Sequence, residues 1–171
     1  MRRGILIGCD QSQEWMLPWW LSHFRACNRL PVAFIDYGMS PKAKAWCVEN
    51  GYLISISAPK DFVFPNGLIE ERLWEKTSRS FCFSKPFALL QTPFDQTVWL
   101  DIGCEVLASL EPLFRKLGCF SVAFARDSRG SELGYNSGVI VYSGKPPLLF
   151  DWAQACLEQN DRFLDDQAIL M

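Results

Sequence analysis

Three aspartates stand at the ends of apolar, β-prone runs, where a carboxylate can bind a cation or contact a ligand. They are Asp10, Asp36 and Asp101. Ligands of open α/β sheets bind outside the carboxyl ends of the strands, so chemistry is expected at these positions. Asp36 begins the turn Asp-Tyr-Gly-Met-Ser, and we interpret it as structural because aspartate side chains stabilise turns. Asp10 and Asp101 are therefore the candidates for function.

The most informative segment is residues 97–107, Thr-Val-Trp-Leu-Asp-Ile-Gly-Cys-Glu-Val-Leu. An apolar strand delivers the carboxylate of Asp101 to its C-terminal end, and a second short apolar run follows. This segment resembles the metal-binding DxD region of family-eight glycosyltransferases, in which an apolar strand leads into Leu-Asp-x-Asp. A sugar nucleotide carries a diphosphate, and a divalent cation held by oxygen ligands neutralises that charge. The resemblance implies that Asp101 binds Mn²⁺ or Mg²⁺.

Two segments nearer the N-terminus also resemble motifs of this family. Asp10 follows the first strand, where the family has an aspartate that contacts the nucleotide. Ser84-Lys85 precedes the DxD-like strand and is similar to a segment whose lysine meets the donor. The resemblance therefore implies that Asp10 and Lys85 bind the nucleotide and its diphosphate.

Two segments after the DxD-like strand follow in the family's order. Residues 135–139, Tyr-Asn-Ser-Gly-Val, are similar to a stretch that lines the donor sugar, so Asn136 and Ser137 are candidate donor-binding residues. Asp166-Gln167 resembles an Asp-Gln pair beside the reacting carbon of the sugar, which makes both residues candidate catalytic residues. Together the matches extend over residues 4–167, nearly the whole chain.

The chain departs from the family pattern at two places. Gly103 stands where the family has its second DxD aspartate, so one expected metal ligand is missing. Glu105 is an alternative ligand, although we expect it to face elsewhere. The sequence stops at Met171, soon after the Asp-Gln pair. The resemblance implies a further metal-binding histidine after this point, so a C-terminally truncated domain is one possibility. His23, the single histidine, lies in the first predicted helix and is expected at the surface.

Each motif also has a purely structural interpretation. Asp101 caps the turn after its strand in this alternative, as aspartates do. Lys85 is then a solvated charge at the exposed start of a short helix, and residues 136–138 form the turn before a strand. Most of the tryptophans are expected in the core, with Trp15 and Trp19 flanking the crevice beside the first strand.

Apolar strand-like runs alternate with helix-like segments along the chain, which is typical of a mostly parallel sheet flanked by helices. We predict an α/β fold of the GT-A type in a single domain, residues 1–171. Strands are expected at 4–9, 31–35, 52–57, 97–100, 119–125 and 137–142. Helices are expected near 17–24, 41–50 with Ser40 as its N-cap, 68–76, 85–91 with Ser84 as its N-cap, 109–117 and 148–156, and a polar loop over 126–135.

The composition is that of an ordinary globular domain. The 171 residues are 49% hydrophobic and 21% charged, with a net charge of −2 that gives no basic surface for nucleic acid. No apolar stretch approaches the roughly 20 residues of a membrane span. Seven cysteines without a Cys-x-x-Cys pair argue against a zinc site or disulfide framework and favour a reducing compartment, so we expect a cytoplasmic protein.

The first hypothesis is a glycosyltransferase-like domain that binds a nucleotide-diphosphate sugar, with UDP favoured by the resemblance, and transfers the sugar to an unidentified acceptor with retention. The second is a catalytically silent relative that binds a nucleotide or a partner protein. The third is a nucleotide-binding domain unrelated to sugar transfer, since many folds share alternating strands and helices. The oligomeric state is not readable from the sequence.

Overall fold

The computed structural model describes residues 1–56, 73–127, 134–163 and 165–170. Its centre is a six-stranded sheet with the order β3-β2-β1-β4-β6-β5. The strands are β1 Arg3–Cys9, β2 Val32–Asp36, β3 Tyr52–Ser55, β4 Gln96–Leu100, β5 Val122–Arg126 and β6 Tyr135–Ser143. The strands from β3 to β4 are parallel, and β6 runs antiparallel to both β4 and β5. The predicted α/β class with a mostly parallel sheet is confirmed.

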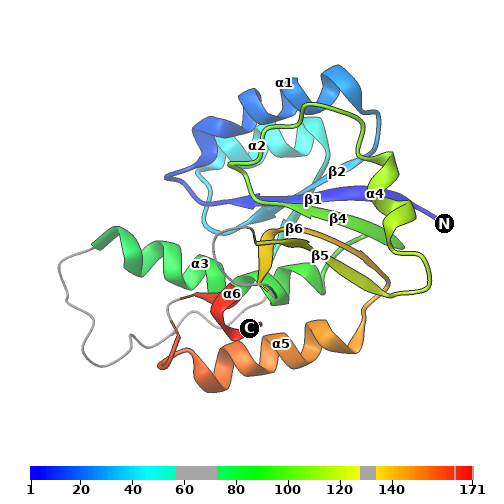
Figure 1. Ribbon diagram of the computed structural model, residues 1–171. Coiled ribbons are helices and arrows are strands. Elements are labelled where there is room, and N and C mark those ends of the chain that lie inside the picture. The colour runs from blue at the N-terminus through cyan, green and yellow to red at the C-terminus, as the bar shows by residue number, and fades with distance from the viewer. Residues whose placement is uncertain (57–72, 128–133, 164, 171) are drawn as a thin grey trace.

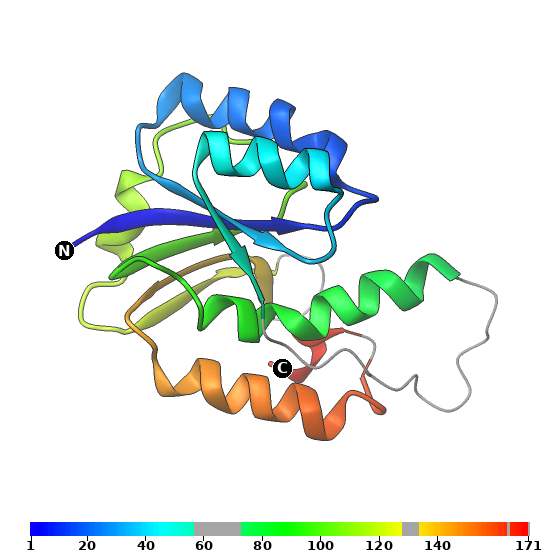
Figure 2. The same cartoon turned by 180° about the vertical axis from the view of Figure 1, so that it is seen from behind.

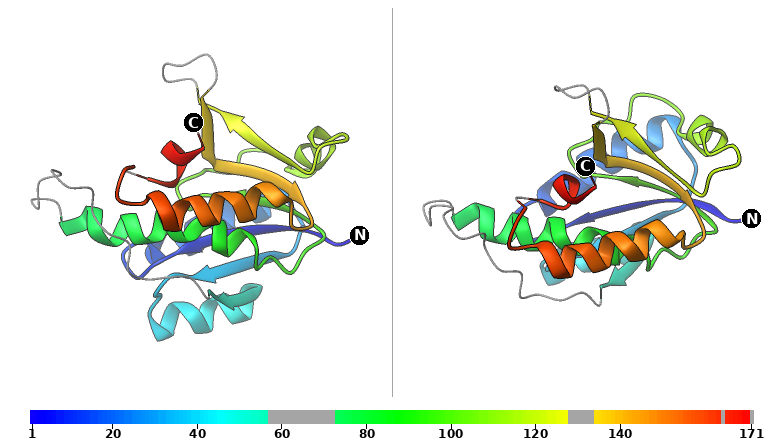
Figure 3. Two further views of the ribbon diagram at one scale, coloured as in Figure 1. Left: turned by 90° about the horizontal axis from the view of Figure 1, so that it is seen from below. Right: turned by 60° about the horizontal axis from the view of Figure 1, so that its bottom comes forward.

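Helices cover both faces of this sheet. They are the 3₁₀ helix η1 Glu14–Met16, α1 Leu17–Cys27, α2 Pro41–Asn50, α3 Leu73–Leu89, α4 Glu111–Lys116, α5 Pro147–Gln159 and α6 Asp166–Ile169. Helices α1 and α2 lie on one face, and α3, α5 and α6 lie on the other (Figures 1 and 2). Figure 3 shows α3 and α5 side by side, with α6 at the same end of the sheet as the C-terminus. No helix among the described residues is long and apolar enough to cross a membrane.

The alternation of side chains along the strands builds a core on each face. In β1, Ile5 and Ile7 pack toward α1 and α2, whereas Leu6 packs toward α3 and α5. In β4, Val98 belongs to the first core and Trp99 to the second. Successive strand residues point to opposite faces, so the residue two positions after Trp99 returns to the side of α3. That residue is Asp101.

The structure contradicts the prediction of two short helices around Ser84. One helix, α3, runs continuously from Leu73 to Leu89 with Pro86 inside it, and residues 68–72 of the first predicted helix lie outside the described residues. Proline removes one backbone donor and normally ends or kinks a helix. Here Ser84, Lys85 and Pro86 are all buried, and tertiary packing of this turn outweighs the local preference for a helix start.

Smaller differences concern the edges of elements. The strand predicted at 119–125 occupies 122–126, and β3 ends two residues before the predicted 57, which itself lies outside the described residues. The predicted loop at 126–135 is shorter, because Asp127 N donates to Gly134 O at 2.8 Å and extends the pairing of β5 with β6. Residues 128–133 of that loop lie outside the described residues.

Two local features agree with the expectations from sequence. Ser40 caps α2, its Oγ accepting from Ala43 N at 3.2 Å. Asp36 has a structural role, since its Oδ1 accepts from the amides of Gly38 and Met39 at 2.9 and 2.8 Å and its Oδ2 pairs with Lys44 at 2.7 Å. Burial opposes ionisation of Asp36, but the bonds from Lys44 and the two amides outweigh it and lower its pKa.

Candidate functional site

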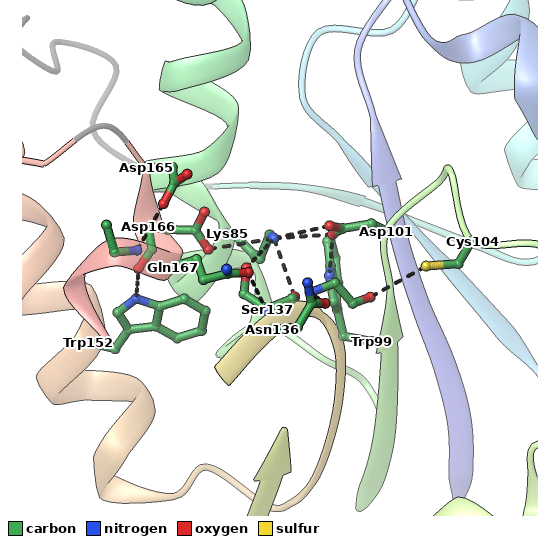
Figure 4. A network of polar contacts seen from close by, with 12 residues as sticks. Lys85, Trp99, Asp101, Cys104, Asn136, Ser137, Trp152, Asp165, Asp166 and Gln167 are labelled. Atoms are coloured by element: carbon green, nitrogen blue, oxygen red, sulfur yellow. Dashed lines mark hydrogen bonds and ion pairs between the residues drawn. The ribbon is translucent and has the colours of Figure 1, made fainter. Parts of the chain in front are cut away.

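A buried ammonium lies at the centre of the candidate site, at the carboxyl end of β4 (Figure 4). Lys85 Nζ, from α3, is 3.2 Å from Asp101 Oδ1 and 3.5 Å from Asp166 Oδ2. It also donates to Ser137, at 3.1 Å to Oγ and 3.3 Å to the carbonyl oxygen. One charge therefore ties together the end of β4, the start of β6, α3 and α6.

Asp101 is fixed by the strand that carries it. Trp99 lies on the same face of β4, and its indole Nε1 donates to Asp101 Oδ1 at 2.8 Å. The backbone N of Asp101 donates to the carbonyl of Gly138 at 2.9 Å. The side chain of Asp101 is 40% exposed, so its carboxylate connects the buried ammonium to the solvent side of the site.

An irregularity in the β5–β6 pairing brings the motif at residues 136–138 to Asp101. Phe124 pairs with Ile140, but Ala125 pairs with Asn136, so residues 137–139 leave the β5 ladder. Bulges commonly redirect side chains beside functional sites. A Cβ on Gly138 would lie 2.9 Å from Asn136 Oδ1 and 3.1 Å from Asp101 Oδ2. Glycine at 138 is what allows this close approach.

The short helix α6 places Asp166 and Gln167 against β6. Its N-cap is Asp165, whose Oδ1 accepts from Ala168 N at 2.8 Å. Trp152 Nε1 in α5 donates to the carbonyl oxygen of Asp166 at 2.9 Å. Gln167 Oε1 accepts from Ser137 N at 2.9 Å, and Gln167 Nε2 donates to an oxygen of Asp127 at 3.3 Å. Asp166 is thus held by α5, and Gln167 is held by Ser137 and Asp127.

Burial dominates the electrostatics of this cluster. Asp166 is only 2% exposed, and burial raises its pKa to about 6, with Lys85 opposing the rise and Asp101 adding to it. Lys85 is 3% exposed; burial lowers its pKa, but Asp166 and Asp101 outweigh that effect and raise the pKa well above its ordinary value. Lys85 is thus a permanent cation, whereas Asp166 gains or loses its charge near pH 6.

The structure brings together five of the sequence-predicted site residues directly, with Asn136 adjoining them: Lys85, Asp101, Ser137, Asp166 and Gln167. The expectation that Lys85 lies at an exposed helix start is wrong, because the residue is buried inside α3. Asn136 Oδ1 accepts from Gly138 N at 2.9 Å and shapes the same turn.

Asp10 is not part of this direct network. Its Oδ1 accepts from Ser12 N at 2.9 Å, Ser12 Oγ at 2.6 Å and Gln13 N at 3.2 Å, so it organises the turn before η1. Asp10 also lines a cavity of about 440 Å³ together with Gln11, Ser12, Tyr37 and Gly38. Because β1 lies beside β4 in the sheet, this cavity opens at the strand end next to that of Asp101.

Tyr37 is a site residue that sequence reasoning missed. Its ring packs against Phe81, with 4.1 Å between the centroids, and a Cβ on Gly8 would lie 2.4 Å from a ring carbon. Its hydroxyl is buried and has no hydrogen-bond partner among the residues that the structure describes. Burial raises the pKa of Tyr37, and the charges of Asp101 and Asp166 raise it further. Tyr37 therefore lines the cavity of Asp10 and is close enough to Asp101 and Asp166 for their charges to raise its pKa. Its position directly after the end of β2 was the available signal.

The positions after Asp101 add no cation ligand. Gly103 is exposed, and a Cβ there would meet nothing within 4 Å. Glu105 faces elsewhere, as expected, with Oε1 3.4 Å from Nε2 of the half-exposed His23. The described part of the chain contains no group of three or more His, Cys, Asp or Glu side chains that could hold a metal ion.

Comparison with solved structures identifies the fold. The galactosyltransferase LgtC, in complex with donor and acceptor sugar analogues, matches with a TM-score of 0.70 and 21% identity over 98% of this chain and 69% of its own. The glycosyltransferase GlyE of Streptococcus pneumoniae matches with a TM-score of 0.69 and 17% identity over 99% of this chain and 42% of its own. The chain therefore has the GT-A fold that the sequence motifs predicted.

A more distant match is core-mannan synthase A of Aspergillus fumigatus in its Mn/GDP form, with a TM-score of 0.61 and 8% identity over 99% of this chain and 68% of its own. Another LgtC structure carries a glutamine-to-glutamate mutation in its active site. No family model matches the sequence, and no curated protein matches it. At these identities the similarity establishes the fold.

Replacing Lys85 by methionine is expected to destabilise the fold, because it leaves the buried Asp166 without its cation. Breaking a buried ion pair from one side costs about 3 kcal/mol. The double variant Lys85→Met/Asp166→Asn removes the unpaired carboxylate as well and should recover part of the loss. Urea unfolding at pH 7.5 measures both. A single variant as stable as the wild type would show that Lys85 does not compensate Asp166.

The raised pKa of Asp166 predicts a pH-dependent stability. A carboxyl whose folded-state pKa lies above its unfolded value stabilises the fold fully below the unfolded value, and that contribution is lost as the pH rises through about 6. The loss is on the order of 2 kcal/mol. Asp166→Asn should flatten the melting temperature between pH 5 and 7.5.

The matched control for this experiment is Asp165→Asn. It removes the neighbouring carboxylate, but asparagine preserves the N-cap of α6. The control is expected to keep most of the pH dependence of the wild type, because burial raises the pKa of Asp166 more than the charge of Asp165 does. Parallel pH profiles for the wild type and Asp166→Asn would contradict a buried carboxyl that titrates near pH 6.

Proposed function

We propose that this chain is a glycosyltransferase-like domain that binds a nucleotide-diphosphate sugar, most favourably one linked to UDP, at the carboxyl edge of its sheet. The observation that carries the proposal is the convergence on Lys85 of residues from four separate segments. These are Lys85 itself, Asp101, Ser137 and the Asp166-Gln167 pair, which the sequence motifs single out together. LgtC, which has the same fold, was solved in complex with donor and acceptor sugar analogues, and this supports the proposal.

Two neighbouring regions suit the two ends of such a ligand. The cavity beside Asp10, of about 440 Å³, lies in the roughly 300–1,000 Å³ range of small-molecule sites. We assign it to the nucleoside. Tyr37 lines this cavity, and the charges of Asp101 and Asp166 raise its pKa. We assign the sugar to the Lys85 cluster, with Asn136 and Ser137 as its contacts. The diphosphate then lies between the two regions.

Sugar transfer would place the reacting carbon beside Asp166 and Gln167. The carboxamide of Gln167 is held by the Ser137 amide and by Asp127, so it is fixed before a ligand arrives. A group held in position needs little reorganisation when charge develops in the transition state. Support for this role comes from LgtC, where a glutamine belongs to the active site. The acceptor is not identified by any feature of this chain.

The cation implied by the resemblance does not fit the residues present. Mn²⁺ and Mg²⁺ require several oxygen ligands. Asp101 is the one carboxylate offered at the DxD position, and it already accepts from Trp99 and pairs with Lys85. Gly103 supplies nothing, and Glu105 contacts His23. Relatives such as core-mannan synthase A occur with Mn, but no step here is assigned to a metal.

A second candidate function is binding without transfer. Glycine at position 103 and the carboxylates already paired with Lys85 favour a catalytically silent relative that keeps the ligand site. The two functions share the binding step and differ in turnover. Incubation with a UDP-sugar, followed by chromatography for free UDP, separates them. Release of UDP above the rate seen with Asp166→Asn would establish transfer or hydrolysis.

Calorimetric titration with UDP, GDP and ADP tests the proposal directly, and saturable heat with UDP is the expected result. Gln167→Ala should weaken binding of a UDP-sugar about tenfold, because it frees the Ser137 amide and removes the group beside the reacting carbon. Gln154→Ala, which changes the same residue type on the exposed face of α5, is the control and should bind as the wild type. Absence of heat with all three nucleotides at millimolar concentration would refute the proposal.

A further inference from the structure

We infer that the ammonium of Lys85 is the resident positive charge of this site, and that the chain binds its ligand without a divalent cation. The inference rests on the proposed function for the ligand, but the claim about the cation stands on the site alone. The residues concerned are Asp101 and the positions after it, where the DxD resemblance implies a metal. Three features of those residues carry it.

The first feature is that the carboxylate of Asp101 is already occupied. Its Oδ1 accepts from Trp99 Nε1 at 2.8 Å and lies 3.2 Å from Lys85 Nζ, and its Oδ2 lies 3.4 Å from the same ammonium. A dication bound to Asp101 would share one carboxylate with a fixed positive charge. Like charges that close together repel strongly. Asp101 is therefore a poor first ligand.

The second feature is the lack of a partner ligand beside it. Gly103 has no side chain, and the carboxylate of Glu105 is directed to His23 at 3.4 Å. Across the described residues, no cluster of three metal-binding side chains forms. Within the part of the chain that the structure describes, octahedral Mg²⁺ or Mn²⁺ at this position would be held by one shared carboxylate and by water.

The third feature is that the ammonium cannot easily move aside. Lys85 is buried, its Nζ lies over the ring of Trp99 at 5.9 Å, and it contacts Asp101, Ser137 and Asp166 at once. Moving it out would leave Asp166 buried without a cation, which is costly. A fixed positive charge beside Asp101 is thus built into α3.

Position 103 provides a sharp test, because a carboxylate can be restored there. The glycine is exposed, its φ is not in the left-handed region, and a side chain would meet open space. Gly103→Asp supplies the missing second carboxylate. Ala108→Asp adds the same charge at an exposed position five residues further along the same segment and is the matched control.

The first measurement uses Mn²⁺ alone, followed by the loss of the electron paramagnetic resonance signal of the free ion. We expect no saturable binding by the wild type or Ala108→Asp up to millimolar Mn²⁺, and at least tenfold tighter binding by Gly103→Asp. Submillimolar binding by the wild type that Asp101→Asn abolishes would overturn the inference. A folded Gly103→Asp that gains no Mn²⁺ would support the inference and would show that the ammonium of Lys85, and not the missing carboxylate alone, keeps the cation away.

The second measurement is calorimetry of UDP with Mn²⁺ and with EDTA. Wild-type affinity should agree within twofold between the two conditions, whereas Gly103→Asp should bind more tightly with Mn²⁺. A wild type that binds UDP only with Mn²⁺ would overturn the inference and leave the proposed function intact. A wild type that binds no UDP in either condition would refute the proposed function, and the Mn²⁺ titration would still decide the question of the cation.

Discussion

The buried ion pair of Lys85 with Asp166 is the constraint on which the rest of the site depends. A charge with almost no exposure must be compensated and hydrogen-bonded, or the fold loses several kcal/mol. Lys85 meets this requirement with atoms from β4, β6 and α6, so those elements must end at one place. The irregular pairing of β6 and the hydrogen bond from Trp152 to α6 help to hold these elements at that place.

Local sequence patterns were sufficient to predict the fold class, because each strand is marked by its own apolar run. Apolar runs ending in aspartate located three of the four parallel strands, and Ser40-Pro41 located the start of α2. The same kind of local reasoning failed at Ser84, where serine before Lys-Pro reads as a helix start. Whether that turn is exposed or buried depends on α5 and the sheet, which the local pattern does not contain.

The sequence predicted which residues form the candidate site better than it predicted how those residues are arranged. Motif order was enough to associate Lys85, Asp101 and the Asp166-Gln167 pair, which the structure places in contact. Motif order did not show that the carboxylate of Asp10 accepts hydrogen bonds within the turn before η1. Nor did it show Tyr37, because a tyrosine becomes notable only when its hydroxyl is buried without a partner near two carboxylates. Burial of that kind arises from long-range packing.

The net charge of the Lys85 cluster connects the missing carboxylate at position 103 with the protonation of Asp166. Two carboxylates around one ammonium leave a net charge of −1 when both are ionised, and an anionic ligand then meets a like-charged site. A divalent cation is one way to reverse this, but the residues offer it no place. Protonation of Asp166 is the other way, since its pKa is raised to about 6 by burial. Below that pH the cluster is neutral, the fold is most stable with respect to this carboxyl, and an anionic ligand meets the least repulsion. With Asp166 protonated, the ammonium of Lys85 and the carboxylate of Asp101 balance each other, and this balance is reached without a metal.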